Sequence, residues 1–219
     1  MDWLDIDKKD LDSSVEESDA YSKEMESKVG KSLEAGVHTV KVSNAYLKDS
    51  GSSDAVMLHL EYEDKDGNKA YTSGWVKNKE GKSFYVDKKT NKKKASPELI
   101  QFKELLSCMD LDLEEIGNPV EVEMEAFGNK FKVKVFKKII DKKLKIGLQK
   151  YEDDYDDGEI KIKSRVIKFM DLDGKYKGDD VEEKVIARLE KSPLRKLKGS
   201  TDAKPKSASG SEESTVDEW

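Results

Sequence analysis

Several features that would identify a function are scarce or absent in this 219-residue chain. Its one cysteine, Cys108, has no partner within the sequence, which excludes an intramolecular disulfide and predicts a buried thiol in a reducing compartment. The two histidines, His38 and His59, stand apart in strand-like patterns, so we expect structural or surface roles for both. No apolar run approaches the roughly 20 residues of a membrane span, and the acidic N-terminus is unlike a signal peptide. We therefore expect a cytoplasmic protein that does not associate with membranes.

Charge is abundant and unevenly placed, although the net charge is only −6. Residues 1–29 hold ten acidic and four basic side chains, and residues 211–219 hold four acidic and no basic ones. Residues 191–210, in contrast, hold six basic side chains and one acidic one. The lysines between the two acidic ends are clustered, so the negative total does not exclude a polyanionic partner.

These shifts in composition predict three regions. Residues 1–29 are expected to be a flexible acidic segment whose apolar residues, among them Trp3 and Leu4, are spaced for docking. Residues 30–191 are expected to form one domain, and residues 192–219 a disordered linker with an acidic tail.

Hydrophobic periodicity within the domain predicts strands and two helices. Period-2 alternation predicts strands at 37–47, 55–63, 69–77, 120–127, 130–136, 145–150 and 160–169. Ser96 and Pro97 mark a helix start, which an apolar stripe from Leu99 to Met109 follows. A second helix is expected at 181–191, with Asp179 as its cap.

The resulting order is three strands, a helix, two or more strands and a final helix. This is the order of the five-stranded Greek-key barrel called the OB fold, which binds oligonucleotides on one face and its loops. We therefore expect a mainly β, OB-like barrel with extra strands and a C-terminal helix. Other α+β sheets share the order, so it does not by itself establish closure.

No pattern of catalytic residues is found, and no cofactor or metal is expected. The acidic clusters at 152–157 and 171–174 lack the ligand spacing of a calcium loop, and we interpret them as solvated turns. The segment 81–83 imitates the end of a phosphate-binding loop but lacks its first glycine, because Val76 stands there.

Lysines that alternate with apolar residues are the positive signal. Such rows predict a basic strand face over a buried one, and binding of single-stranded nucleic acid needs cations for phosphates together with exposed rings for bases. The candidate backbone contacts are Lys88, Lys89, Lys92, Lys93, Lys94, Lys130, Lys132, Lys134, Lys161, Lys163 and Arg165. The candidate stacking residues are Tyr71, Trp75, Phe84, Tyr85 and Phe136. Solubilising lysines and core aromatics are the alternative interpretation of the same pattern.

The C-terminal tail joins acidic side chains to a terminal aromatic residue. A ring and terminal carboxylate can enter a pocket on a partner while the acids pair with basic residues at its rim. The candidate partner-binding residues are Glu212, Glu213, Asp217, Glu218 and Trp219.

In this tail and in its strand order, the chain resembles the single-stranded DNA-binding proteins of bacteriophage and bacterial replication. Those proteins have an OB fold, a linker and an acidic tail that ends in an aromatic residue. Their tails usually end in phenylalanine, so Glu218-Trp219 departs from the pattern. The resemblance implies a non-enzymatic, sequence-independent single-stranded DNA-binding protein of phage replication or recombination, whose tail recruits a polymerase, helicase or recombination protein.

Two alternatives remain open at the level of sequence. In the first, the chain is a protein-interaction module that binds no nucleic acid, and its lysines only keep it soluble. In the second, it is a nuclease that uses Asp and Glu side chains around magnesium, although no carboxylates stand at convincing strand ends. The pattern does not define the oligomeric state.

Overall fold

The computed structural model describes residues 4, 32–126, 129–154 and 160–196. Strands account for 49% of the described structure and helices for 18%. The elements are β1 (Gly36–Asp49), β2 (Val56–Glu63), β3 (Lys69–Lys77), β4 (Phe84–Val86), β5 (Lys93–Ala95), α2 (Pro97–Ser107), α3 (Leu113–Ile116), β6 (Val120–Ala126), β7 (Asn129–Val135), the 3₁₀ helix η1 (Lys137–Ile139), β8 (Lys143–Asp154), β9 (Ile160–Met170), β10 (Lys175–Tyr176), β11 (Asp179–Asp180), α4 (Glu182–Lys191) and β12 (Leu194–Arg195).

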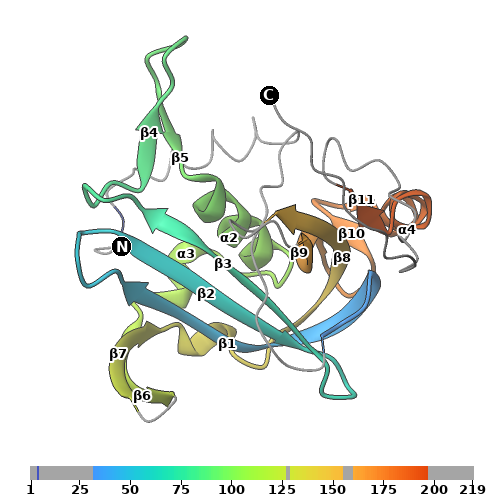
Figure 1. The fold of residues 1–219 in the computed structure, drawn as a ribbon, viewed down its shortest axis with the longest axis horizontal. Helices are drawn as coiled ribbons and strands as arrows, with labels where there is room; N and C mark the ends of the chain where they lie inside the picture. The colour runs from blue at the N-terminus through green and yellow to red at the C-terminus, as the bar shows by residue number, and fades with distance from the viewer. Residues whose placement is uncertain (1–3, 5–31, 127–128, 155–159, 197–219) are drawn as a thin grey trace, which may run out of the picture.

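A large sheet, almost entirely antiparallel, organises the molecule (Figure 1). β1, β2 and β3 form a meander, β8 pairs with the first half of β1 on its other side, and β9 pairs with β8. The β6–β7 hairpin joins the last residues of β1, where Tyr46 is opposite Val135. β12 lies parallel to the second half of β8. The expected mainly β fold is confirmed at this level.

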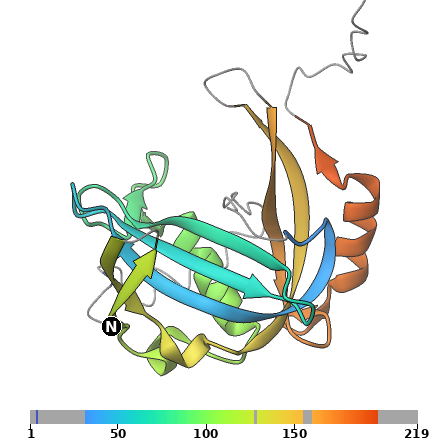
Figure 2. The ribbon, with the colours of Figure 1, turned by 60° about the horizontal axis from the view of Figure 1, so that its bottom comes forward.

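The sheet does not close into the expected barrel. β3 and β9 approach each other, but no pairing joins them within the described strands. α2 contacts both strands, so helical side chains fill the interior across this seam. Beyond the seam, β8 and β9 continue as a long hairpin that leaves the meander, with α4 beside it (Figure 2).

The core lies between the inner face of the sheet and α2. The ring centroids of Phe102 and Phe136 are 5.2 Å apart, and those of Tyr62 and Phe169 are 6.2 Å apart. Ser96 caps α2 as predicted, because its hydroxyl accepts from the Leu99 amide at 3.3 Å. Cys108 is buried as predicted, and burial raises the pKa of its thiol to about 12.

The C-terminal helix does not begin at its predicted cap. α4 starts at Glu182 after Val181, with no side-chain hydrogen bond at the cap, and Asp179 lies in β11 instead. The expected Asp179 cap is therefore wrong, because the β10–β11 hairpin takes that residue. α4 then packs closely on β8, since an ideal Cβ at Gly147 would lie 2.5 Å from Val185 Cγ1.

Several short elements were not predicted, among them β4, β5 and α3. β4 and β5 form a hairpin, so the lysine-rich stretch expected as a loop becomes its tip and second strand. Strands of three residues are too short to show a period. α3 is a single turn, held by a capping box between Asp112 and Glu115.

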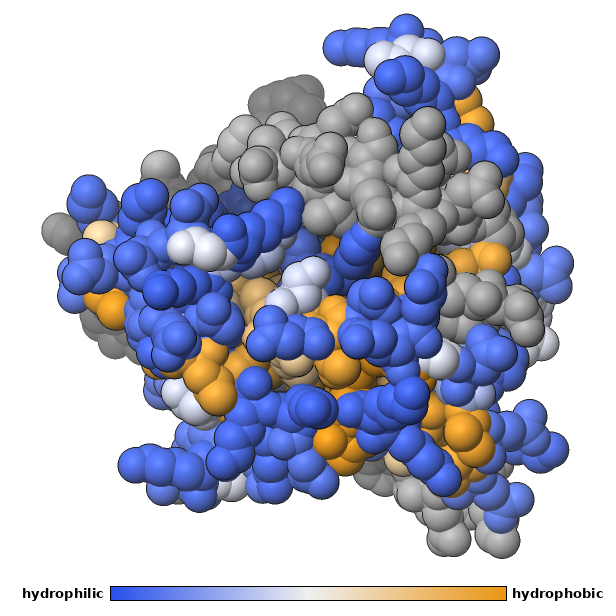
Figure 3. Space-filling view, turned by 180° about the vertical axis from the view of Figure 1, so that it is seen from behind, coloured by the Kyte–Doolittle hydropathy of each residue, from blue (hydrophilic) through white to orange (hydrophobic). Residues whose placement is uncertain are grey.

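Outside the core, the described surface is largely polar. Seen from behind, hydrophilic side chains cover most of it, and hydrophobic residues show between them (Figure 3). Leu4 packs against the main core, as a docking N-terminal segment requires, while Trp3 lies outside the described residues. Among the described residues, no helix is long and apolar enough to cross a membrane.

Phe136 is predicted to stabilise the fold. Phe136→Ala should lower the free energy of unfolding by about 3–5 kcal/mol, because it empties a fully buried ring site beside Phe102. Urea unfolding measures this change. Tyr85→Ala is the matched control, since that ring is 50% exposed and its removal should change stability by less than about 0.5 kcal/mol. Equal effects of the two substitutions would contradict the packing described.

Candidate nucleic-acid interface

The outer face of the meander is built from rungs that each take one residue from β1, β2 and β3. Strand register aligns Lys48 with Met57 and Trp75, then Tyr46 with His59 and Ser73, then Asn44 with Glu61 and Tyr71, and finally Lys41 with Glu63 and Lys69. Successive rungs stand about 7 Å apart, two residues along each strand. The residues between them, such as Leu58 and Leu60, face the core and are buried.

These rungs form the floor of two neighbouring hollows, which together make up the groove. A hollow of about 500 Å³ lies over the Tyr46 and Glu61 rungs, and another of about 670 Å³ lies over the Trp75 rung. Both are lined by Met57 and His59, so they lie next to each other. Met124 and Phe131 of the β6–β7 hairpin line the first hollow as well.

Loops complete the second hollow. The β1–β2 loop contributes Ser50, Ser52 and Ser53, and the turn after β3 contributes Asn78 and Lys79. The groove therefore runs over the face of β2 and β3 and ends between two loops at the Trp75 end.

The rings in the groove are uncharged at neutral pH. Tyr46 and His59 stack, with ring centroids 4.8 Å apart and planes inclined by 13°. Burial, assisted by the nearby Lys48 ammonium, lowers the pKa of His59 to about 4. Burial first, and then the Glu61 carboxylate, raises the pKa of the Tyr46 and Tyr71 hydroxyls. Neutral aromatic faces at such spacing suit stacking of planar ligands.

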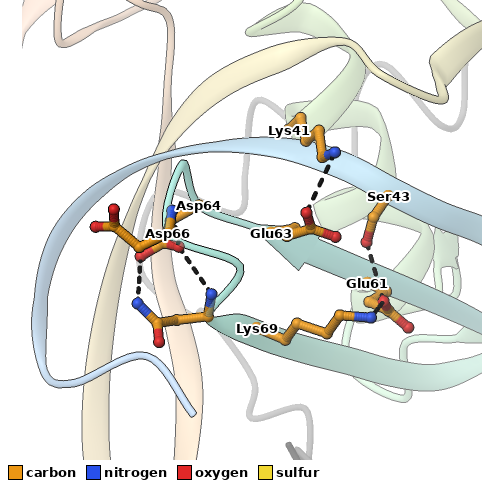
Figure 4. Close-up of polar contacts among 8 residues, drawn as sticks. Lys41, Ser43, Glu61, Glu63, Asp64, Asp66 and Lys69 are labelled. Atoms are coloured by element: carbon orange, nitrogen blue, oxygen red, sulfur yellow. Dashed lines mark hydrogen bonds and ion pairs between the residues drawn. The ribbon is translucent and has the colours of Figure 1, made fainter. Parts of the chain in front are cut away.

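The opposite end of the groove is closed by ion pairs (Figure 4). Lys41 Nζ lies 3.3 Å from Glu63 Oε1, and Lys69 Nζ lies 2.6 Å from Glu61 Oε1. The hydrogen bond to Glu61 raises the pKa of the Lys69 ammonium. Pairs this exposed add little stability, but they neutralise the charges at this end.

Lysines without a carboxylate partner lie toward the Trp75 end. Among the described residues, the ammonium groups of Lys48 and Lys79 in the groove make no ion pair, and Lys48 Nζ stands 5.0 Å from the Phe131 ring centroid. β4 follows the 78–82 turn directly, so its hairpin projects from this end (Figure 1). The hairpin presents four exposed lysines, which form no ion pair with any described residue: Lys88, Lys89, Lys92 and Lys93.

Two lysines of the row predicted on β7 are balanced by acids of β6 and β1. Register sets Lys132 opposite Glu123 and Lys134 opposite Glu121. Lys132 Nζ lies 2.8 Å from Glu121 Oε1, and Lys134 Nζ lies 3.5 Å from Asp49 Oδ2. Lys130 is opposite Glu125, and its side chain lies outside the described part of the structure. A neutralised row is a weaker phosphate track than the sequence of β7 alone predicted.

The predicted stacking residues separate into distinct environments. Tyr71 and Trp75 both line the groove, and Trp75 is 45% exposed. Tyr85 is exposed on the β4–β5 hairpin, whereas Phe84 packs partly against the core with Lys93 Nζ 4.5 Å from its ring centroid. Lys94 pairs with Asp87 at 3.2 Å in the same hairpin.

Two predicted contacts are buried and cannot meet a ligand in this structure. Phe136 is 1% exposed, because β7 ends at Val135 and the chain turns into η1, so the expected alternation stops one residue early. Arg165 is 5% exposed and donates from Nη2 to Gln149 Oε1 at 2.7 Å.

The prediction of a basic face over a buried apolar one on β9 is also wrong. Ile160 and Ile162, expected beneath the lysines, are 55% and 64% exposed. Lys163 is half-buried and pairs with Asp153 at 2.6 Å, and Lys161 is exposed on the same hairpin. This part of the β8–β9 hairpin projects beyond the main core, so alternation there does not reveal which face is covered (Figure 2).

Most of the residues that line the groove were not predicted from the sequence, since only Tyr71 and Trp75 were named as candidates. Tyr46, His59 and Phe131 line it, as do the polar residues Asn44 and Glu61. The sequence did indicate Tyr46 and His59. Alternation assigns both rings to the polar face of strands that were correctly predicted. No local pattern indicated that the face of β7 that carries Phe131 would border the groove.

The described residues contain no cluster of three or more His, Cys, Asp or Glu side chains that could hold a metal ion. The tail residues Glu212, Glu213, Asp217, Glu218 and Trp219 lie outside the described part of the chain. In comparisons with known proteins, no family model and no curated protein matches this sequence. The function is therefore inferred from the geometry of the groove.

The depressed pKa of His59 predicts that this side chain destabilises the fold in acid. In the unfolded chain the imidazole takes up a proton near pH 6.5, while in the folded chain it does so only near pH 4. Stability is therefore full above pH 6.5 and falls as the pH drops toward 4, by on the order of 1–2 kcal/mol for a partly solvated ring.

Two-dimensional NMR of the ring protons, recorded from pH 7.5 to 3.5, reads the His59 titration directly. His59→Gln should remove this component from the pH dependence of the unfolding midpoint. A folded-state titration near 6.5 would contradict the desolvated position described for the ring.

Proposed function

We propose that this protein is a non-enzymatic single-stranded DNA-binding protein that binds the strand along the outer face of β1, β2 and β3. One observation carries the proposal: a groove with aromatic rings at successive rungs and, at its open end, lysines that make no ion pair with any described residue. Single-strand binding combines stacking platforms with cationic groups for the backbone and requires no catalytic residue. Hollows of about 500 and 670 Å³ suit nucleobases.

The order of strands supports an OB-like interpretation of the sheet. β1 lies between β2 and β8, β3 follows β2, β9 follows β8, and α2 comes after the third strand. This is the OB arrangement, opened at the seam between β3 and β9, with the β6–β7 hairpin inserted after the helices. OB folds bind oligonucleotides on the face of their second and third strands and on the loop between the first two. The groove occupies the equivalent face and loop.

The acidic tail supports the narrower part of the proposal. By resemblance, the protein acts in phage DNA replication or recombination in the host cytoplasm, where it protects single strands. The tail ending in Glu218-Trp219 recruits a polymerase, helicase or recombination protein. A tail that carries acids and a terminal ring has both elements needed to enter a basic-rimmed pocket.

A protein-interaction module is the competing function, because an extended peptide could also lie across a sheet face. The cations favour nucleic acid. Lys48 and Lys79 in the groove make no ion pair with any described residue, and neither do the four exposed lysines of the β4–β5 hairpin. The phosphates of a polyanion would supply partners for all of them.

Trp75 is predicted to report on binding. Trp3→Phe and Trp219→Phe together leave Trp75 as the single tryptophan, and oligo-dT should quench its fluorescence by stacking on the ring. Trp75→Ala should weaken oligo-dT binding by about 1–3 kcal/mol, measured by fluorescence polarisation. Leu172→Ala is the control, because Leu172 is 51% exposed and lines neither hollow of the groove. Absence of both quenching and binding would favour the protein-interaction module.

Salt dependence is predicted to distinguish the two groups of lysines. Replacing Lys88, Lys89, Lys92 and Lys93 by Ala should reduce the slope of log K against log salt by about 0.7 for each phosphate group that the variant no longer binds. Replacing Lys132 and Lys134, which are already paired with acids, should leave the slope nearly unchanged. Titrations at a series of salt concentrations give both slopes. The reverse result would indicate that the lysines of β7, not those of the β4–β5 hairpin, bind the phosphates.

A further inference from the structure

Glu61 places a carboxylate among the aromatic rungs of the groove. Its Oε1 atom accepts two hydrogen bonds, from Ser43 Oγ at 3.1 Å and from Lys69 Nζ at 2.6 Å (Figure 4). Its Oε2 atom accepts none from any described residue. The side chain is 21% exposed and lines the hollow with Tyr46 and Tyr71.

Two donors therefore orient the carboxylate and saturate one oxygen, while the other keeps its full acceptor capacity. The carboxylate is held rigidly, since its partners come from both neighbouring strands. Asn44 is the register partner of Glu61 on β1, and its side-chain amide makes no hydrogen bond with the described residues. The rung of Glu61 thus offers a fixed carboxylate acceptor beside an adaptable side-chain amide.

Lys69 is already paired with Glu61, so this rung offers phosphates no free cation and favours a strand that runs with its bases toward the sheet and its backbone toward the lysines of the Trp75 end. A base stacked on these rungs presents its edge to Glu61. Cytosine presents an exocyclic amine, which is the group that Asp and Glu accept from in base recognition. Thymine presents carbonyl oxygens on either side of a single N–H, and these face the carboxylate unfavourably.

We propose that Glu61 makes the groove selective among bases, so that it prefers cytosine, with its exocyclic amine, to thymine. The inference rests on the proposed single-strand binding and adds base preference to it. Charge-assisted hydrogen bonds in partly exposed sites are strong enough to expect roughly fivefold tighter binding of oligo-dC than of oligo-dT.

The test compares dissociation constants of the full chain for dC and dT oligomers of equal length, at pH 8 and fixed salt. Wild-type protein should bind dC about fivefold more tightly. Glu61→Gln should bring the ratio to about one, because an amide can both accept from and donate to thymine. The isosteric variant keeps an oxygen for Ser43 and Lys69, and an unchanged melting temperature verifies its fold.

Glu63→Gln is the matched control. Glu63 lies one rung away, in the same type of ion pair with Lys41, and does not line either hollow of the groove. Glu63→Gln should affect both oligomers alike and leave the dC-to-dT ratio at its wild-type value, whereas Glu61→Gln should weaken dC relative to dT.

The outcomes separate the two proposals. Binding of both oligomers with a wild-type ratio within twofold of one, or a ratio that Glu61→Gln leaves unchanged, would overturn the role of Glu61 and leave single-strand binding intact. Binding of neither oligomer by wild-type protein would overturn the proposed function itself, and base selectivity with it.

Discussion

The register of the ladder between β1, β2 and β3 is the constraint on which the rest of the structure depends. It places Tyr46, His59 and Tyr71 on one face while Leu58 and Leu60 enter the core on the other. A slip of one residue would exchange the two faces, burying the polar set and exposing the apolar one. The buried contacts with α2 hold the register, so the same packing that stabilises the fold aligns the groove.

β1 has a second role, because it is shared by three parts of the sheet. Its first half pairs with β8 and its last residues with β7, while β2 runs along its other side. A bulge between Val42 and Asn44 lies where these partners change. A bulge bends its strand, and the β6–β7 hairpin pairs with β1 beyond this point. Phe131 and Met124 of the hairpin complete a wall of the groove that the meander alone lacks.

Cross-strand pairing also determines which lysines are available to a ligand. Those of β7 face glutamates of β6 across the hairpin, and Lys163 is paired with Asp153. The lysines at the tip of the β4–β5 hairpin have no such neighbours among the described residues. Counting basic residues along one strand therefore overestimated the charge of that face, because a charge acts together with its partner on the next strand.

Local patterns were enough to predict the meander, the start of α2 and the buried cysteine. The alternation of β3 and the Ser96-Pro97 cap are short-range signals that packing did not override. The tertiary structure alone decided that Phe136 is core, that Arg165 is buried and that the β3–β9 seam stays open. Each of these three outcomes depends on where a strand ends or on which surface covers it. Periodicity in the sequence shows that residues alternate between two faces, but it does not show which face is covered.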